Sequence, residues 1–182
     1  MSIKTNFLVI SVILSSIFSY AQEIPKFKLH PNGIEPIIFK VPNLGIQDIQ
    51  EATHNWYLAN QEEYQLSVVE SKSDAETVYY RGNLAKGWSY SQLGVKVFHD
   101  MDFTLRVDFK DAKYRLSINI GKFTETLTGN EVKDLENFYK REGYVTLLES
   151  LNKLSISLNK TITNYSKSQK KEQKEQAETE SW

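Results

Sequence analysis

The chain has no cysteine among its 182 residues. Disulfides, thiol catalysis, thiolate metal ligands and lipid attachment through a cysteine are therefore all excluded. A chain of this length can be held together by its hydrophobic core alone. Histidine is also scarce, with three widely separated residues, His30, His54 and His99. Phosphate loops, HExxH motifs and nucleophile elbows do not occur, so we predict no catalytic residues, no metal site and no cofactor.

The sequence also has no excess of basic residues. It carries 22 Lys and Arg against 23 Asp and Glu, which gives a formal net charge of −1. Proteins that bind nucleic acids normally need a strong positive excess, because their cations replace the counterions on phosphate. We therefore expect no nucleic-acid partner.

Long hydrophobic runs are missing after the first residues of the chain. Lys4 is followed by an apolar run from Phe7 to Phe18 and by Ser19-Tyr20-Ala21, a small-x-small cleavage site. This order is typical of a secretory signal peptide and is too short for a membrane span. We predict a signal peptide over residues 1–21 and a mature chain of 161 residues that has no transmembrane segment. The protein is then exported, to the periplasm or cell envelope of a Gram-negative bacterium.

Proline occurs four times, and all four residues lie between Pro25 and Pro42. Residues 22–35 are therefore predicted to be an extended leader. Residues 36–165 then form a single domain. From Ser166 the chain is a polar Lys/Glu/Gln run, and we predict a disordered tail over residues 166–182.

Apolar periodicity predicts three helices. The first covers about Ile46 to Asn60, a short one lies near residues 132–143, and a long one covers about Tyr144 to Tyr165. The long helix carries an apolar stripe made of Leu147, Leu151, Leu154, Leu158 and Ile162. This stripe fits packing on a sheet, and the alternative is that it binds a partner helix.

Short apolar and β-branched runs predict strands at Ile37–Val41, Tyr64–Glu70 and Glu76–Arg81. A segment punctuated by glycines, Gly82 to Gly94, separates them from the longest regular pattern. That pattern alternates apolar and polar residues from Val95 to Phe109 and resumes from Tyr114 to Ile120. Pairing Phe109 with Tyr114 places apolar residues opposite apolar residues and Asp108 opposite Arg115.

The stretch HDMDFTLRVDF (His99 to Phe109) looks like a metal or proton-transfer site, because His99 is next to Asp100 and close to Asp102. Neighbouring side chains of a strand point to opposite faces. His99 therefore faces the core, and the two aspartates face water. A hydrolase that uses Asp100 and Asp102 is the least favoured alternative, because an open charged surface does not separate their pKa values.

Three segments resemble the domain of unknown function 4468 (DUF4468) family of exported bacterial envelope proteins. They are VPNLGIQDI (Val41–Ile49), ATHNWYLAN with Trp56, and FTLRVDFKDAKYRLSI (Phe103–Ile118). The resemblance implies an α+β fold like that of the TATA-binding protein, called TBP-like. Such a fold is a curved antiparallel sheet of about five strands, in the order strand, helix, four strands, helix, with the helices packed on one face. The family carries no established activity, so the resemblance implies a fold and a compartment.

The turn between the last two strands differs from the family pattern, which usually has Asp-Gly. Here it reads Asp111-Ala112. Alanine at a positive φ costs about 1 kcal/mol relative to glycine. We expect the turn to relax into a four-residue loop that keeps the same facing pair.

The favoured function is a non-enzymatic binding or interaction module. Trp88 and Tyr90, on the glycine-punctuated segment, are the predicted ligand-binding residues, because aromatic side chains on a loop can stack on a sugar or cover a ligand. Their alternative role is packing at the edge of the core. The predicted partner is a small molecule, a glycan or an envelope protein. A structural or assembly component that uses the C-terminal helix is the alternative function.

Overall fold

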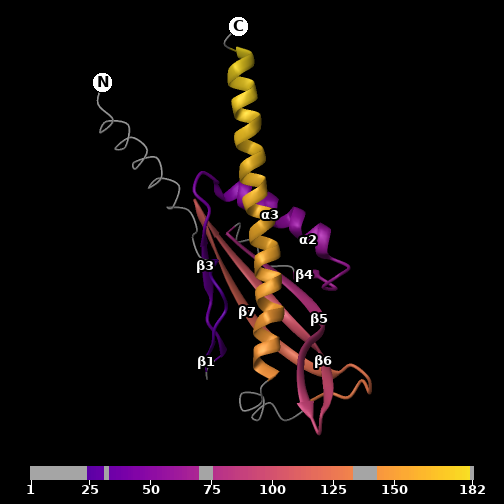
Figure 1. The fold of residues 1–182 in the computed structure, drawn as a ribbon. Helices are drawn as coiled ribbons and strands as arrows, with labels where there is room; N and C mark the ends of the chain where they lie inside the picture. The colour runs from indigo at the N-terminus through magenta and orange to yellow at the C-terminus, as the bar shows by residue number, and fades with distance from the viewer. Residues whose placement is uncertain (1–23, 31–32, 70–75, 133–142, 181–182) are drawn as a thin grey trace, which may run out of the picture.

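An antiparallel sheet and a pair of helices form the two layers of the structure (Figure 1). This computed structural model describes residues 24–30, 33–69, 76–132 and 143–180. The expected signal peptide and the expected short helix near residues 132–143 fall outside these ranges, apart from the ends of that helix. None of the helices in these ranges combines the length and the apolar composition that a membrane-spanning helix needs.

The described elements are short near the N-terminus and long near the C-terminus. The strands are β1 (Leu29–His30), β2 (Gly33–Ile34), β3 (Ile37–Lys40), β4 (Ser67–Val69), β5 (Thr77–Gln92), β6 (Val95–Lys110) and β7 (Lys113–Glu125). The helices are α2 (Ile46–Asn60) and α3 (Gly143–Glu180). Five of the strands form one antiparallel sheet in the order β3-β7-β6-β5-β4, while β1 and β2 form a separate hairpin. The predicted α+β class and five-stranded antiparallel sheet are confirmed.

The β6–β7 hairpin has the register that the sequence predicts. The facing pairs include Phe109 and Tyr114, Val107 and Leu116, Leu105 and Ile118, and Asp108 and Arg115. Apolar side chains meet on one face of the hairpin, and an acid meets a base on the other. A slip by one residue would exchange the two faces, so this pairing fixes which side of the sheet is buried.

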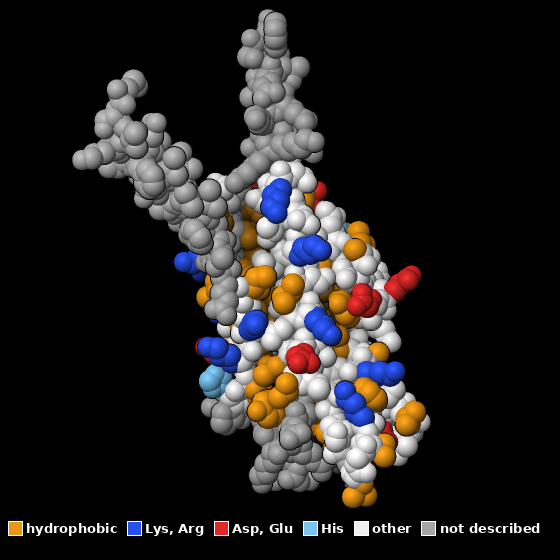
Figure 2. Space-filling view, viewed as in Figure 1, with side chains coloured by type: hydrophobic (Ala, Val, Ile, Leu, Met, Phe, Trp, Pro, Cys, Tyr) orange, Lys and Arg blue, Asp and Glu red, His pale blue; other side chains and the backbone are white. Residues whose placement is uncertain are grey.

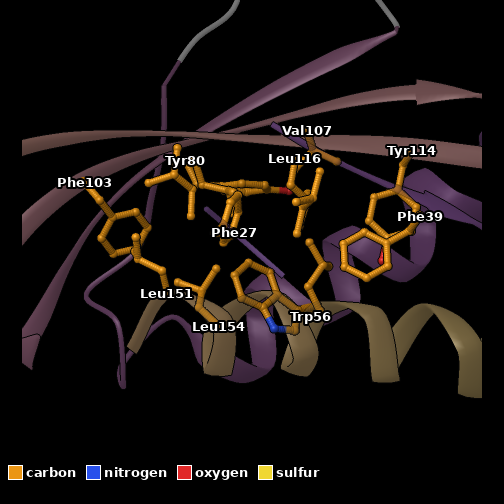
Figure 3. Packing of buried hydrophobic residues seen from close by; sticks show 14 of the residues in the cluster. Phe27, Phe39, Trp56, Tyr80, Phe103, Val107, Tyr114, Leu116, Leu151 and Leu154 are labelled. Carbon is orange, nitrogen blue, oxygen red and sulfur yellow. The ribbon is translucent and has the colours of Figure 1, made fainter. Parts of the chain in front are cut away.

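We call the face of the sheet that the helices cover its inner face. The apolar stripe of α3 packs there, and its members are fully buried: Leu147, Leu151, Leu154, Leu158 and Ile162. Figure 3 shows Leu151 and Leu154 of α3, together with Trp56 of α2, pointing toward Val107 and Leu116 of the sheet. The leucine stripe is therefore part of the chain's own core, and assembly through these leucines has no exposed surface to use.

Polar bonds fix the helices to one another and to the sheet. The indole Nε1 of Trp56 donates to Ser157 Oγ at 3.1 Å, which joins α2 to α3. The hydroxyl of Tyr114 on β7 donates to Asn159 Oδ1 on α3 at 2.8 Å. Burial raises the pKa of Tyr114, so its hydroxyl keeps its proton and stays a donor. Because hydrogen bonds are directional, these two bonds fix how α3 is aligned with α2 and with the sheet.

The glycine-punctuated segment differs from its prediction, because it continues β5 as a strand as far as Gln92. A bulge between Leu84 and Trp88 accommodates it. A Cβ on Gly87 would lie 2.9 Å from Leu84 Cβ and 3.4 Å from Met101 Cβ. Glycine is therefore required here by close packing inside a bulge, and it does not mark a loop.

The two ends of the described chain are also more ordered than the sequence predicts. In the leader, Phe27 is buried in the core, and its backbone N–H donates to Asn152 Oδ1 of α3 at 2.8 Å. At the other end, α3 continues to Glu180, past the edge of the sheet in Figure 1, whereas the sequence predicts a disordered tail from Ser166. The segment after Ser166 is rich in Lys, Glu and Gln and has no proline or glycine, so its composition favours a solvated helix.

The Asp111-Ala112 turn does not relax into a longer loop. Lys110 still faces Lys113 across two turn residues, and Ala112 has a φ of 59°. The strained turn is held by the connection between β3 and α2. The N–H of Ala112 donates to Leu44 O at 3.0 Å, and its carbonyl accepts from the Val41 N–H at 2.8 Å.

Candidate functional site

The candidate site is the outer face of the sheet, which points away from both helices. Alternate residues of β6 from Lys96 to Lys110 supply its middle row. Both helices lie on the inner side, so neither covers this face in the described chain (Figures 1 and 3). The outer face is thus a broad, polar surface carried on long, regular strands.

His99 and its neighbouring aspartates lie on opposite faces, as predicted. His99 is buried on the inner face, with its ring centroid 4.3 Å from that of Trp88 and 5.4 Å from that of Tyr90. Asp100 and Asp102 point outward and are not buried. Within the described residues, no group of three or more His, Asp or Glu side chains could hold a metal ion.

Asp100 accepts two hydrogen bonds from neighbouring segments on the outer face. Its Oδ1 accepts from the backbone N–H of Lys86 at 2.8 Å and from the Thr126 hydroxyl at 2.9 Å. Lys86 lies in the β5 bulge and has a φ of 54°. Asp100 therefore holds the bulge against β6 and the chain that follows β7.

Asp102 borders a shallow hollow of about 400 Å³ on the outer face, which β4 to β7 line. Its Oδ1 accepts from the amide of Asn83 at 2.9 Å. A second bulge, between Met101 and Phe103, brings Gly121 so close that a Cβ there would lie 3.1 Å from Asp102 Cβ. The two carboxylates thus have separate local partners and do not form a paired acid–base site.

Asp108 is the centre of a charged cluster farther along β6. It accepts from Arg106 Nη2 at 2.7 Å, from Arg115 Nη2 at 2.8 Å and from the Thr77 hydroxyl at 2.9 Å. Partial burial alone would raise the pKa of Asp108. The hydrogen bonds from Arg115, Arg106 and Thr77 outweigh this effect and lower it.

Beyond this cluster, three lysines form a row across three adjacent strands. Lys40 of β3 faces Lys113 of β7, which faces Lys110 of β6. We call these three residues the lysine row. Next to the row is a hollow of about 180 Å³ whose lining includes Ile38, Lys110, Lys113, Arg115 and Asp108. Three of these five side chains are cationic and one is anionic, so the hollow has a positive surplus.

The sequence alone predicts only two of the three members of the lysine row. The predicted hairpin register already places Lys110 opposite Lys113, but Lys40 joins them through the pairing of β3 with β7. That pairing connects strands far apart in the chain, and no local pattern predicts it.

The predicted ligand-binding residues lie elsewhere, on the inner side of β5. Trp88 is 1% exposed and packs on His99 and on Phe123, whose ring centroid is 5.0 Å away. Tyr90 is half-buried beside Trp88. The structure therefore places both side chains at the edge of the core, on a strand, and ligand binding by them stays a prediction.

No family model matches the chain, and no curated protein matches it. Solved structures of similar fold do exist. A DUF4468 family protein from Bacteroides ovatus superposes with a TM-score of 0.50 at 13% identity, over 77% of this chain and 90% of that one. A TBP-like protein from Parabacteroides distasonis gives a TM-score of 0.47 at 11% identity, over 73% of this chain and 91% of that one. The chain therefore shares its fold with a DUF4468 family protein, as the sequence resemblance predicted.

Proposed function

We propose that this protein is an exported, non-enzymatic interaction module of the bacterial envelope, and that its outer sheet face docks an acidic segment of a partner protein. The lysine row is the observation that supports this proposal most strongly. Export rests on the signal sequence, Lys4 followed by Phe7–Phe18 and the cleavage site, and it is part of the proposal.

Three like charges in direct register lower the stability of the isolated sheet. Like charges opposite each other on adjacent strands cost roughly 0.2–1 kcal/mol per pair. The row contains two such pairs, Lys40 with Lys113 and Lys113 with Lys110. An acidic segment lying along the row removes this repulsion and gains three charge contacts, so the row favours a bound state.

The neighbouring hollow adds an apolar element to this surface. Ile38 is 55% exposed on β3, where it faces Arg115 of the Arg115–Asp108 pair, and it lines the hollow together with Lys110 and Lys113. An acidic side chain has an aliphatic stem and a charged end. The stem can contact Ile38 while the carboxylate contacts Lys113 or Lys110, which makes the hollow suited to a glutamate or aspartate of a peptide.

Other uses of the fold have less support from the geometry. The space between the sheet and α3 is filled by fully buried side chains, and the leucine stripe is internal. The outward carboxylates Asp100, Asp102 and Asp108 each hold a neighbouring group in place. A hydrolase built on them would lose these structural bonds during its reaction.

The proposal is tested by fluorescence anisotropy with a fluorescein-labelled oligoglutamate peptide as the probe. The triple variant K40Q/K110Q/K113Q should bind it about tenfold or more weakly, because it loses three charge contacts. Binding by the unmodified chain should also weaken as salt is raised, because these contacts are exposed and screened.

A matched control removes three exposed lysines from other surfaces, in the variant K28Q/K153Q/K160Q. Its net charge equals that of the test variant, so a general charge effect would weaken both equally. We expect the control to bind within about twofold of the unmodified chain. Equal loss in both triple variants, or no measurable binding by the unmodified chain, would overturn the proposal.

A further inference from the structure

We infer that the end of the molecule opposite the lysine row is a contact site for an anionic lipid surface. This end comprises the β5–β6 turn and residues 126–132, which follow β7, and both lie at the same end of the sheet in Figure 1. We call its apolar residues, Leu93, Val95, Phe98 and Leu127, the apolar tip. Strand β6 places Val95 and Lys110 at its two ends, about 50 Å apart at 3.3 Å per residue. The inference thus concerns a different surface from the proposed function.

Leu93 is the strongest indication of a function at this end. It is 99% exposed, and it adopts a φ of 49° in the turn Leu93-Gly94. Two-residue turns of this kind favour asparagine, aspartate or glycine at such a position, because other residues are strained there. A leucine here therefore helps neither the turn nor the core. Residues that oppose folding in this way are typically retained for binding.

Leu127, on the neighbouring loop, is a second almost fully exposed leucine. It is 93% exposed, and the N–H of the preceding residue, Thr126, donates to Phe98 O at 3.0 Å. This bond ties the loop to β6 close to Phe98, which is itself 36% exposed. Two separate loops thus present bulky apolar side chains at the same end of the sheet.

Two cations accompany these apolar side chains. Lys96 Nζ lies 5.2 Å from the centroid of the Phe98 ring, and Lys86 Nζ lies 5.5 Å from it. Figure 2 likewise shows hydrophobic side chains beside Lys or Arg side chains at the end formed by the β5–β6 hairpin. Glu125, also at this end, accepts from the Thr128 hydroxyl at 2.8 Å. The two ammonium groups complement anionic headgroups at the depth where the apolar side chains enter the acyl boundary.

The shape of the tip favours a lipid surface over a protein groove. Leu93 and Leu127 project from two different turns, and each side chain is more than nine-tenths exposed. A fluid bilayer adapts to such separate projections, whereas a protein partner would need a matching pocket for each. Shallow insertion beside basic residues is how peripheral proteins attach to an interface without spanning it.

The test is flotation of the chain from Gln22 with two kinds of vesicle. One contains phosphatidylglycerol and phosphatidylethanolamine, and the other contains phosphatidylcholine alone. The unmodified chain should float with the anionic vesicles and much less with the neutral ones. The variant L93N/L127S should bind about tenfold more weakly or worse, since two leucines no longer insert.

The variant is chosen so that folding is retained. Leu93→Asn creates an Asn-Gly turn, which suits the backbone better than Leu-Gly, and Leu127 is almost fully exposed. The control Leu58→Gln removes an exposed leucine from α2, away from the tip, and should leave flotation unchanged. The inference is overturned if the unmodified chain floats with neither kind of vesicle. It is overturned as well if L93N/L127S floats to the same extent as the control Leu58→Gln. It is also overturned if the tip variant loses a co-purifying protein while vesicles never bind. None of these results involves oligoglutamate binding, so the proposed function is tested separately.

Discussion

The carboxylate of Asp100 accepts a hydrogen bond from the backbone N–H of Lys86 at 2.8 Å and thereby holds the β5 bulge in place. Asp100→Ala should lower the free energy of unfolding by about 1–2 kcal/mol, because the bulge loses a charged acceptor. Asp102→Ala, which removes one bond from an Asn83 side chain, should cost clearly less. Urea unfolding of both variants measures the difference. Equal losses would mean that Asp100 does not hold the bulge.

The strained turn offers a stabilising change. Ala112→Gly should raise the free energy of unfolding by about 0.5–1 kcal/mol, because glycine adopts the φ of 59° without a Cβ penalty. Thermal and urea unfolding would both detect this increase. Lys113→Gly, next to the turn in β7, is the control and should destabilise, because glycine is unfavourable inside a strand. A loss of stability in Ala112→Gly would contradict the assigned turn conformation.

Because Trp88 is buried, we expect its replacement to lower stability whether or not it binds a ligand. Trp88→Ala should lower the free energy of unfolding by about 3–5 kcal/mol, because it removes a fully buried side chain from the edge of the core. Tyr90→Ala should cost less, because Tyr90 is half-buried. If Trp88→Ala instead unfolds at the same urea concentration as the unmodified chain, the packing role of the indole is contradicted and the predicted ligand role is favoured.

The lowered pKa of Asp108 predicts that the free energy of unfolding falls as the solution is made acidic. Its pKa in the folded chain lies below the usual value of 3.8, because bonds from Arg115, Arg106 and Thr77 outweigh burial. Its contribution to stability is therefore fully present above about pH 4 and is lost as the pH falls through the lowered pKa. Asp108→Asn should be less stable than the unmodified chain at neutral pH, and this difference should shrink in acid. Urea unfolding of both proteins at neutral pH and in acid measures this difference. A difference that grows in acid would contradict the lowered pKa of Asp108.

The parts of the fold that the sequence predicted are those fixed by short-range patterns. The alternation through His99, Met101 and Phe103 gave the inner face, and matching charges gave the Asp108–Arg115 register. A side-chain period of two also separated His99 from Asp100 correctly, which removed the apparent metal site.

Other features depend on contacts between distant segments. The sequence predicts a loop at Gly87, but this glycine allows close packing against Leu84 and Met101 inside a strand. The sequence also predicts an extended leader around Phe27, although the core and Asn152 hold this residue. Lys40 became part of the lysine row only through the pairing of β3 with β7. In each case the deciding partner is remote in the chain, so local propensity could not indicate it.

Photo-crosslinking in intact cells would show whether the outer face docks an acidic partner. A photoreactive phenylalanine analogue is placed at Ile38 on the outer face, or at Ile156, which is exposed on α3. We expect a crosslink from position 38 to an acidic segment of one protein, its loss in K40Q/K110Q/K113Q, and no such product from position 156. A crosslink from position 38 that persists without the three lysines, or a product from position 156 alone, would contradict the proposal.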